Sequence, residues 1–377
     1  MLLLQTVHDW FWWDRLWLPA NYTWADLRDE EGLVLPKASH FYITVPGALL
    51  FMVVRHFFER FVGTPVAGAM GIKDKARRKA RGNPVLEDCF VSGSKNPSQN
   101  EIYGLAKKSN LTELQVARWF RRRRNQDRPS VLKKFQESCW RFVFYLCAFI
   151  GGIAVLYDKP WLYEIWLVWE NYPKQSYLIS QYWYYVLELS FYWSLLFSVA
   201  SDVRRKDFKV QVIHHCSTIF LLNFSWCVNY VRVGTLTLLV HDTSDFLLEA
   251  AKMCSYAGWK TSCNVLFVIF AVMFLITRLI IFPGWIIYAT VVYPLYICPT
   301  FFLYYAFNTI MFTLQALHIY WSYLIFKMVK KVFRGNMSGD DRSDKEEDDL
   351  SEDGEEQCMQ NGARAGKHRV LNGQPDH

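Results

Sequence analysis

Five ionisable side chains lie within two consecutive apolar stretches of this 377-residue chain: His214, His215, His241, Asp242 and Asp245. The paired histidines belong to residues 210–231, and the other three belong to residues 233–251. Ionisable side chains at bilayer depth are costly, so they persist where they are paired, hydrated or functional. The five groups therefore predict a polar centre inside a membrane.

Histidines together with carboxylates suit the transfer of an acyl group from a thioester to a nitrogen. A neutral imidazole accepts a proton from an amine or attacks the thioester itself, and a nearby carboxylate fixes its tautomer and stabilises the imidazolium. We therefore predict that His214, His215, Asp242 and Asp245 are catalytic. Their residue types do not say which histidine is the nucleophile and which is the base.

Two other interpretations of these residues stay open. Buried polar side chains also join transmembrane helices, although five ionisable groups on adjacent helices are many for that role. The second alternative is a metal site, because the spans carry His214, His215, His241 and His318. Membrane diiron enzymes use HxxxH and HxxHH boxes, which these histidines do not form. We therefore expect no metal.

Helical spacing predicts that polar faces of two neighbouring helices meet. On the second helix His241, Asp245 and Glu249 are four residues apart and so share one face. The connection to the first helix, near residues 229–232, is short, which makes the two helices antiparallel neighbours. The residues expected to contact substrate are His241, Glu249, Trp193 and Asn308.

The elements that must position these groups are transmembrane helices. Hydrophobic residues form 52% of the chain, and the charged residues are gathered between apolar blocks, which is typical of a polytopic membrane protein. We predict an all-α helical bundle with about seven transmembrane helices, and expect the sixth to tilt or re-enter at Pro283. The predicted spans are 41–62, 140–157, 181–200, 210–231, 233–251, 262–288 and 300–327.

Alternate loops are basic, which sets the predicted orientation. Lysine and arginine follow the first, third and seventh spans, so the C-terminus is expected in the cytosol and the N-terminus in a lumen. The sequon that begins at Asn21 then lies on the lumenal side, where it can be glycosylated.

Composition divides the chain into five parts: a lumenal segment (1–40), a first span (41–62), a basic cytosolic segment (63–130), a transmembrane catalytic domain (131–332) and an acidic, disordered tail (333–377). In the tail, Ser338, Ser343 and Ser351 precede acidic residues and are candidate phosphorylation sites. The chain has no P-loop, G-x-G-x-x-G or G-x-S-x-G motif, which disfavours nucleotide hydrolysis and serine-hydrolase chemistry.

The basic segment resembles the recognition helix of a homeodomain. We expect Thr112 to cap this helix, and Val116, Trp119 and Phe120 to face its core. A homeodomain needs an asparagine two residues after the phenylalanine to pair with adenine, and Arg122 stands there instead. DNA binding is therefore not expected. Anionic lipid headgroups attract such a juxtamembrane basic run, so a role at the membrane surface is favoured.

A combined set of motifs resembles the ceramide synthases of the TRAM-LAG1-CLN8 family. The stretches that carry the resemblance are 190–193, Asp202 to Phe208, the His214–His215 pair and residues 241–249, together with 119–126 for the homeobox-like segment. Residues 102–108 and 361–377 look most like family members that use very long acyl chains.

The resemblance implies an endoplasmic-reticulum enzyme that N-acylates sphinganine or sphingosine with a fatty acyl-CoA as co-substrate and needs no cofactor. It also implies that the paired histidines, Asp242 and Asp245 belong to the active site, that the protein forms homo- or heterodimers with other ceramide synthases, and that residues 289–299 influence acyl-chain length. A non-catalytic lipid-binding or sensing protein of the same fold is the alternative.

Overall fold

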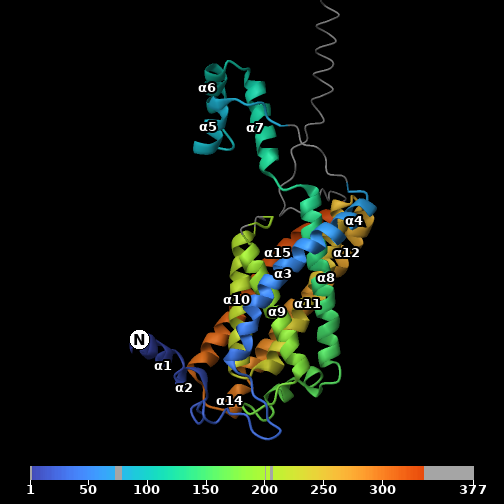
Figure 1. The fold of residues 1–377 in the computed structure, drawn as a ribbon. Coiled ribbons are helices and arrows are strands. Elements are labelled where there is room, and N and C mark those ends of the chain that lie inside the picture. The colour runs from blue at the N-terminus through green and yellow to red at the C-terminus, as the bar shows by residue number, and fades with distance from the viewer. Residues whose placement is uncertain (1, 73–78, 200, 204–206, 335–377) are drawn as a thin grey trace, which may run out of the picture. The chain divides into compact units, whose positions relative to one another are not determined.

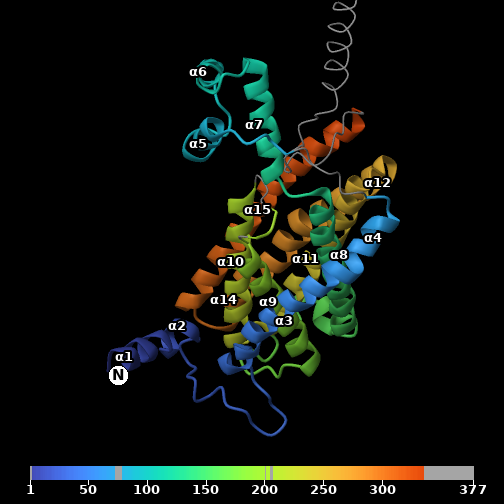
Figure 2. The same cartoon turned by 45° about the horizontal axis from the view of Figure 1, so that its top comes forward.

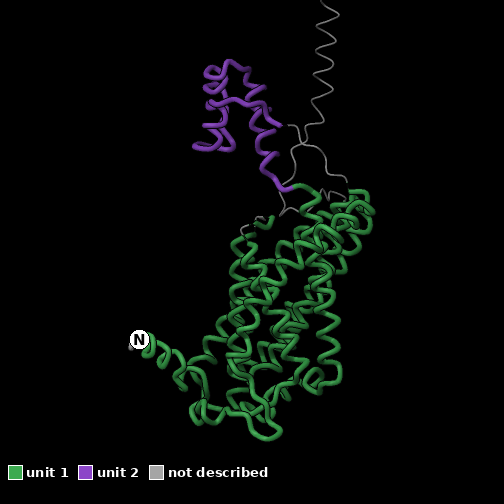
Figure 3. The backbone as a smooth tube through the Cα atoms, viewed as in Figure 1, with its two compact units in different colours: residues 1–74, 130–343 green, residues 75–129, 344–377 purple. Residues whose placement is uncertain are grey.

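The computed structural model describes residues 2–72, 79–199, 201–203 and 207–334. These residues form helices and loops, with no named strand among them. They belong to two compact units, one of residues 1–74 and 130–343 and the other of residues 75–129 and 344–377 (Figure 3). The tail residues Ser338, Ser343 and Ser351, and the tail from residue 335 onward, lie outside the described residues.

The first unit is a bundle of long helices (Figure 1). Its main helices are α3 (Thr44–Phe58), η2 (Glu59–Gly63), α4 (Thr64–Ala69), α8 (Val131–Leu156), α9 (Ile179–Ser198), α10 (Phe208–Cys227), α11 (Val231–Tyr256), α12 (Lys260–Leu275), η5 (Ile276–Ile287) and α15 (Phe302–Phe333). The shorter helices are α1 (Leu2–Phe11), α2 (Asp14–Trp17), η1 (Ala38–Ile43), η3 (Pro160–Leu162), η4 (Ile165–Trp169), α13 (Tyr288–Val291) and α14 (Pro294–Ile297).

Four helical stretches of the described residues are long and apolar enough to cross a membrane. They are Ala38–Ala69, Glu113–Leu156, Lys260–Ile297 and Phe302–Phe333. Helices α9, α10 and α11 fall outside this set, because tyrosines, histidines and charged residues lower their hydropathy. The residues that suggest chemistry are therefore on the least apolar helices of the bundle.

The less apolar helices pack against the apolar ones. Helix α11 packs against α8 and α12, α3 packs against α9, and α10 packs against both α9 and α15. The same helices run side by side in a second view of the molecule (Figure 2). This packing brings segments that are far apart in the sequence around the polar face of α11.

The sixth predicted span, which was expected to tilt or re-enter at Pro283, is a continuous helical stretch through this residue. Residues 276–287 are π-helical, and α12, η5 and α13 form one helical stretch. A π-helical turn shifts the hydrogen-bonding register, so the missing N–H of proline is accommodated without a break. The same π-helical turn carries Arg278, whose side chain is 3% exposed.

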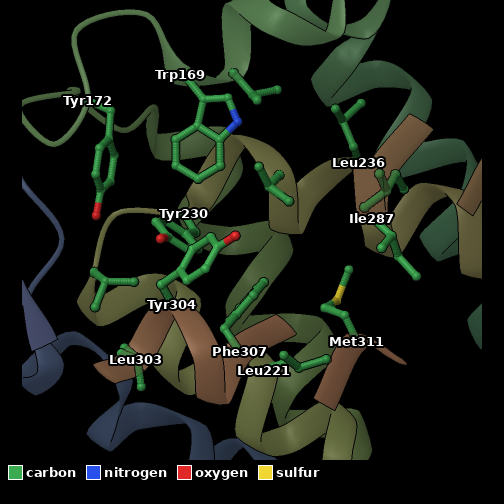
Figure 4. Packing of buried hydrophobic residues seen from close by; sticks show 14 of the residues in the cluster. Trp169, Tyr172, Leu221, Tyr230, Leu236, Ile287, Leu303, Tyr304, Phe307 and Met311 are labelled. Atoms are coloured by element: carbon green, nitrogen blue, oxygen red, sulfur yellow. The ribbon is translucent and has the colours of Figure 1, made fainter. Parts of the chain in front are cut away.

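One end of the bundle holds an aromatic core (Figure 4). Buried members include Trp169, Tyr230 and Phe307, with ring centroids of Trp169 and Tyr230 4.9 Å apart and those of Tyr230 and Phe307 5.1 Å apart. The Trp169 Nε1 donates a hydrogen bond to the carbonyl oxygen of Ala289 at 2.9 Å. This core therefore fixes the start of the 289–299 segment against the ends of the helices.

A buried ion cluster joins the first long helix to the chain before α10. The guanidinium of Arg55 pairs with Asp202 at 2.8 Å and with Glu59 at 2.7 Å, and Arg141 pairs with Asp202 at 2.9 Å. The side chain of Glu137, 4% exposed, lies 3.8 Å from Arg55. Paired in this way, the charges near the end of the first predicted span are compatible with burial.

The second unit contains α5 (Pro84–Ser92), α6 (Gln99–Ser109) and α7 (Glu113–Asp127). The Thr112 hydroxyl accepts a hydrogen bond from the N–H of Gln115, so the predicted cap is confirmed. The predicted core positions are also confirmed, because Val116, Trp119 and Phe120 are buried in one cluster with residues of α5 and α6. Hence this small unit has a hydrophobic core of its own.

Candidate active site

A cavity of about 130 Å³ lies within the first unit, among side chains from α8, α9, α10, α11, α12, η5 and α15. This volume corresponds to several water molecules. Polar and charged groups form much of its wall, and phenylalanines, leucines, an isoleucine and a tryptophan form the rest. The lining residues are Arg141, Tyr145, Leu195, Gln211, His214, His215, Asp245, Leu248, Glu249, Lys252, Phe270, Phe274, Arg278, Trp321 and Ile325.

The paired histidines reach this cavity from α10. The ring of His214 lies 5.3 Å from that of Trp321 and 5.6 Å from that of His215, measured between centroids. The ring of Tyr192, on α9, lies 5.7 Å from His215. Both imidazoles are partly buried and sit between aromatic side chains, beside the same hollow.

Close contacts hold α9, α10 and α11 together and so fix the position of the paired histidines on α10. The hydroxyl of Tyr185 lies 3.1 Å from Oγ of Ser225 on α10. A Cβ at Gly234 of α11 would lie 1.5 Å from the same hydroxyl, so only glycine lets α11 approach this closely.

Between α10 and α11, Asn229 takes a left-handed conformation with φ of 62°. Its Nδ2 donates to the carbonyl oxygens of Pro173 and Gln175.

Asp245 and Glu249 bring carboxylates from α11 to the cavity. The Nη2 of Arg278 donates to Oδ1 of Asp245 at 3.0 Å and to the carbonyl oxygen of His241 at 2.6 Å. The Nζ of Lys252 lies 2.5 Å from Oε1 of Glu249. Each cavity carboxylate is therefore paired with a cation, which is what a buried charge requires.

Asp242 points elsewhere. Its Oδ2 accepts a hydrogen bond from the hydroxyl of Tyr184 at 3.0 Å. Tyr184 is on α9, and Asp242 does not line the cavity. Among the described residues, no hydrogen bond joins a carboxylate to the ring of His214 or His215. Of the two aspartates predicted to be catalytic, Asp245 lines their cavity.

His241 is beside the cavity and contacts the histidine of α15. Its Nδ1 lies 2.6 Å from the carbonyl oxygen of Thr237, so this nitrogen carries the proton. Its Nε2 lies 3.3 Å from Nε2 of His318, and the latter nitrogen accepts a hydrogen bond from Nη1 of Arg278 at 3.3 Å. His241 thus helps to hold Arg278 and His318 in place beside the cavity.

Three histidines come close enough to share a metal ion. The ligand nitrogens of His214, His241 and His318 all lie within 4.8 Å of one another. The guanidinium of Arg278 points at one of these nitrogens, and its positive charge opposes a dication there. The donor set suits zinc in residue type, but its electrostatic surroundings do not suit it.

Two residues predicted to contact substrate lie away from the cavity. Trp193 packs against Phe197 on the same helix, with 5.7 Å between ring centroids. The Nδ2 of Asn308 donates to the carbonyl oxygens of Thr290 at 3.2 Å and Tyr304 at 3.0 Å. Asn308 therefore fixes the start of the 289–299 segment and does not line the cavity.

Three buried or partly buried ionisable residues of the bundle were not among the predicted site residues: Arg278, Arg141 and Glu188. Each is an ionisable residue within or beside a predicted span, so the rule that selected the histidines would have selected them too. Arg141 bridges the cavity and the ion cluster, because it lines the former and pairs with Asp202. Lys252 was missed because it lies just beyond the predicted end of its span.

Two family models and several named proteins match this chain. A family model described as TLC domain matches residues 134–327, and a homeodomain model matches residues 80–129. Ceramide synthase 3 of Homo sapiens is 52% identical to this chain, and the match covers 100% of both proteins. The chain belongs to the ceramide synthase family.

Other ceramide synthases match over nearly the same length. Ceramide synthase 4 of Mus musculus is 47% identical over 98% of this chain and 95% of its own. Ceramide synthase hyl-1 of Caenorhabditis elegans is 33% identical over 89% of this chain and 83% of its own. The resemblance stated from the sequence motifs is confirmed.

Proposed function

We propose that this protein is a ceramide synthase that transfers the acyl group of a fatty acyl-CoA to the amino group of sphinganine or sphingosine. This acyl transfer is supported by the identity of 52% and 47% to two named ceramide synthases over 100% and 98% of the chain. The observation that carries the site is the shared cavity of His214, His215 and Asp245 within a bundle of apolar helices. A hydrophobic bundle around a polar cavity suits two substrates that each combine a long hydrocarbon chain with a polar reacting group.

In the reaction a C–N bond forms and the thioester C–S bond breaks. In a direct route the neutral amine attacks the thioester carbonyl carbon, and the electron pair of the C–S bond leaves with the CoA sulfur. In a covalent route a histidine nitrogen attacks first and CoA leaves in the same way. The amine then attacks the acyl-imidazole, and the bond between the acyl carbon and the histidine nitrogen breaks. One amine proton passes to an imidazole and then to the departing thiolate. His214 and His215 are the two groups in the cavity suited to these roles, and their assignment to nucleophile and base stays open.

Asp245 and Arg278 support these histidines through charge. The Arg278–Asp245 pair places opposite charges beside the cavity, where the oxygen of the attacked carbonyl gains negative charge and an imidazole gains positive charge. Asp242 acts at a greater distance, by fixing α11 against α9 through Tyr184. In this scheme Asp245 lies beside the reacting groups and Asp242 positions its helix.

We further propose that α9, α10 and α11 cross the membrane together with the four apolar stretches, giving seven spans in the endoplasmic reticulum membrane. The N-terminus then faces the lumen and the C-terminus the cytosol. Asn21 is exposed, as an acceptor of a glycan must be. Protein expressed in cells should migrate faster after glycosidase treatment, and the variant Asn21→Gln should not. A shift that survives in the variant would contradict the assignment.

We propose that the reaction needs no metal, and that the protein works as a homodimer or as a heterodimer with another ceramide synthase. Arg278 beside His318 is the support for the first statement. Purified active protein should contain less than one equivalent of transition metal and should keep its rate in the presence of a chelator. Inactivation by the chelator with recovery on adding zinc would refute it.

Acyl transfer by the purified protein is the decisive test. The full chain in phosphatidylcholine nanodiscs is given sphinganine and a mixture of acyl-CoAs, and the products are identified by mass spectrometry. We expect ceramides whose formation requires both substrates. Binding of both substrates without product above background would instead favour the non-catalytic lipid-binding alternative.

A further inference from the structure

The homeodomain-like unit has a pocket of its own, which the proposed acyl transfer does not use. It has a volume of about 350 Å³, within the range of small-molecule sites. Three arginines and no acidic side chain are among the described residues that line it. The lining residues are Ala80, Arg81, Gly82, Asn83, Leu111, Gln115, Arg118, Trp119 and Arg122.

The walls of this pocket are held by hydrogen bonds. The Nε1 of Trp119, whose side chain is buried, donates to the carbonyl oxygen of Arg81 at 2.6 Å. The Oδ1 of Asn83 accepts from the N–H of Val85 and of Leu86, which fixes the chain as it enters α5. The segment 80–83 therefore has a defined position against α7.

Arg118 and Arg122 are one helical turn apart on α7, so both present guanidinium groups to the pocket. Arg123, the next residue, has a different role. It pairs with Glu87 at 2.9 Å and with Asp127, and thereby holds α5 to α7. Arg123 therefore joins two helices of the unit, and Arg118 and Arg122 line a space large enough for a ligand.

Arg122 stands where a homeodomain needs its adenine-binding asparagine. A guanidinium has five donors and no acceptor, so it cannot repeat the bidentate pairing of asparagine with adenine. It does match the geometry of a phosphate, which accepts two parallel N–H bonds. The residue that removes base recognition thus adds a phosphate-binding group to an already basic pocket.

We propose that this pocket binds the phosphate or pyrophosphate group of a small ligand or of a lipid headgroup. The guanidinium groups of Arg81, Arg118 and Arg122 bind the phosphate oxygens. Leu111 and the ring of Trp119 form an apolar side, which accepts the part of the ligand that carries the phosphate. Such a site recognises a compact anion, unlike a surface that follows a nucleic acid duplex.

Binding is measured by calorimetry on the full chain in nanodiscs of phosphatidylcholine alone. The soluble probes are inorganic pyrophosphate and adenosine 3′,5′-bisphosphate. A second set of nanodiscs contains phosphatidic acid, and loss of soluble-probe binding there reports competition by the lipid. We expect saturable binding of a soluble probe in the first set. Loss of that binding in the second set would identify a lipid headgroup as the source of the phosphate, and unchanged binding would identify a soluble ligand.

Matched variants test the position of the site. Arg118→Gln/Arg122→Gln should weaken binding by about tenfold or more for each guanidinium removed. Lys107→Gln/Lys108→Gln removes two charges from exposed positions of α6 in the same unit and should leave binding unchanged. Arg81→Gln alters an exposed loop side chain, so it tests the pocket without disturbing α7.

Equal loss in the arginine and lysine variants would overturn the proposal, because it would mean non-specific attraction of anions. Absence of binding for every probe and for phosphatidic acid would overturn it as well. If duplex DNA bound more tightly than all phosphate probes and lost affinity in Arg118→Gln/Arg122→Gln, a nucleic-acid surface would replace the proposed pocket.

Discussion

Replacing Arg278 by methionine should be among the most damaging single changes to this protein. The substitution keeps much of the side-chain volume but removes the ion pair to Asp245, the bond to the carbonyl oxygen of His241 and the bond to His318. Breaking a buried ion pair from one side costs about 3–5 kcal/mol, because the other charge stays buried and uncompensated. At about 2 °C for each kcal/mol, the apparent Tm should fall by roughly 6–10 °C.

A double-mutant cycle isolates the ion pair from the other bonds of Arg278. Asp245→Asn alone leaves the guanidinium with His241 and His318, so it should destabilise less than Arg278→Met. The double variant should be more stable than the sum of the single effects predicts, by at least about 1.5 kcal/mol. The control pair is Arg278→Met with Asn21→Gln, whose effects should add.

The assay is thermal unfolding in nanodiscs, followed by intrinsic fluorescence, with acyl transfer measured on the same samples. Additive effects of Arg278→Met and Asp245→Asn, within about 0.5 kcal/mol, would refute the argument that these two charges depend on each other. Normal turnover by Arg278→Met at low temperature, where the protein stays folded, would remove Arg278 from the catalytic scheme but not from the fold.

Four further substitutions test other parts of the structure. His214→Ala and His215→Ala should each lower acyl transfer by more than about a hundredfold without a change in apparent Tm, and activity near that of the unaltered protein would disprove their role. Gly234→Ala places a methyl group against the hydroxyl of Tyr185 and should destabilise the fold by about 3 kcal/mol, measured by thermal unfolding, whereas an unchanged Tm would show that α11 can shift freely. Asn308→Ala frees the segment after α13 and should change the acyl-length distribution of the ceramides, measured by mass spectrometry, more than it changes the total rate. A lower total rate with an unchanged distribution would instead mean that Asn308 belongs to the active site.

The sequence predicted the helical class and the helices that carry the site, because hydropathy and helical spacing are local properties. It also predicted that Asp245 and the paired histidines share a cavity. It did not separate Asp242 from Asp245, since a difference of three residues leaves both near one face of α11. The packing of the neighbouring helices decides which aspartate lines the cavity. Asp242 is bonded to Tyr184 of α9, and Asp245 is bonded to Arg278 of η5.

The role of Asn308 could not be read from the sequence either. It was expected to contact substrate, but its amide donates a hydrogen bond to the carbonyl oxygen of Thr290. Thr290 lies in α13, a helix of four residues, and helices this short have weak sequence signals. Contacts between a long helix and a short connecting segment depend on the tertiary arrangement alone.

The concentration of charge on α11 has a consequence for how the protein is made. Each aspartate near the centre of a nascent helix adds about 2.5–3.5 kcal/mol to the cost of leaving the translocon for lipid. Asp242 and Asp245 find their partners on α9, already synthesised, and on η5, not yet synthesised. We therefore expect α11 to be retained at the translocon until Arg278 emerges. Chains truncated after α11 but before Arg278 should not enter the bilayer and should be degraded.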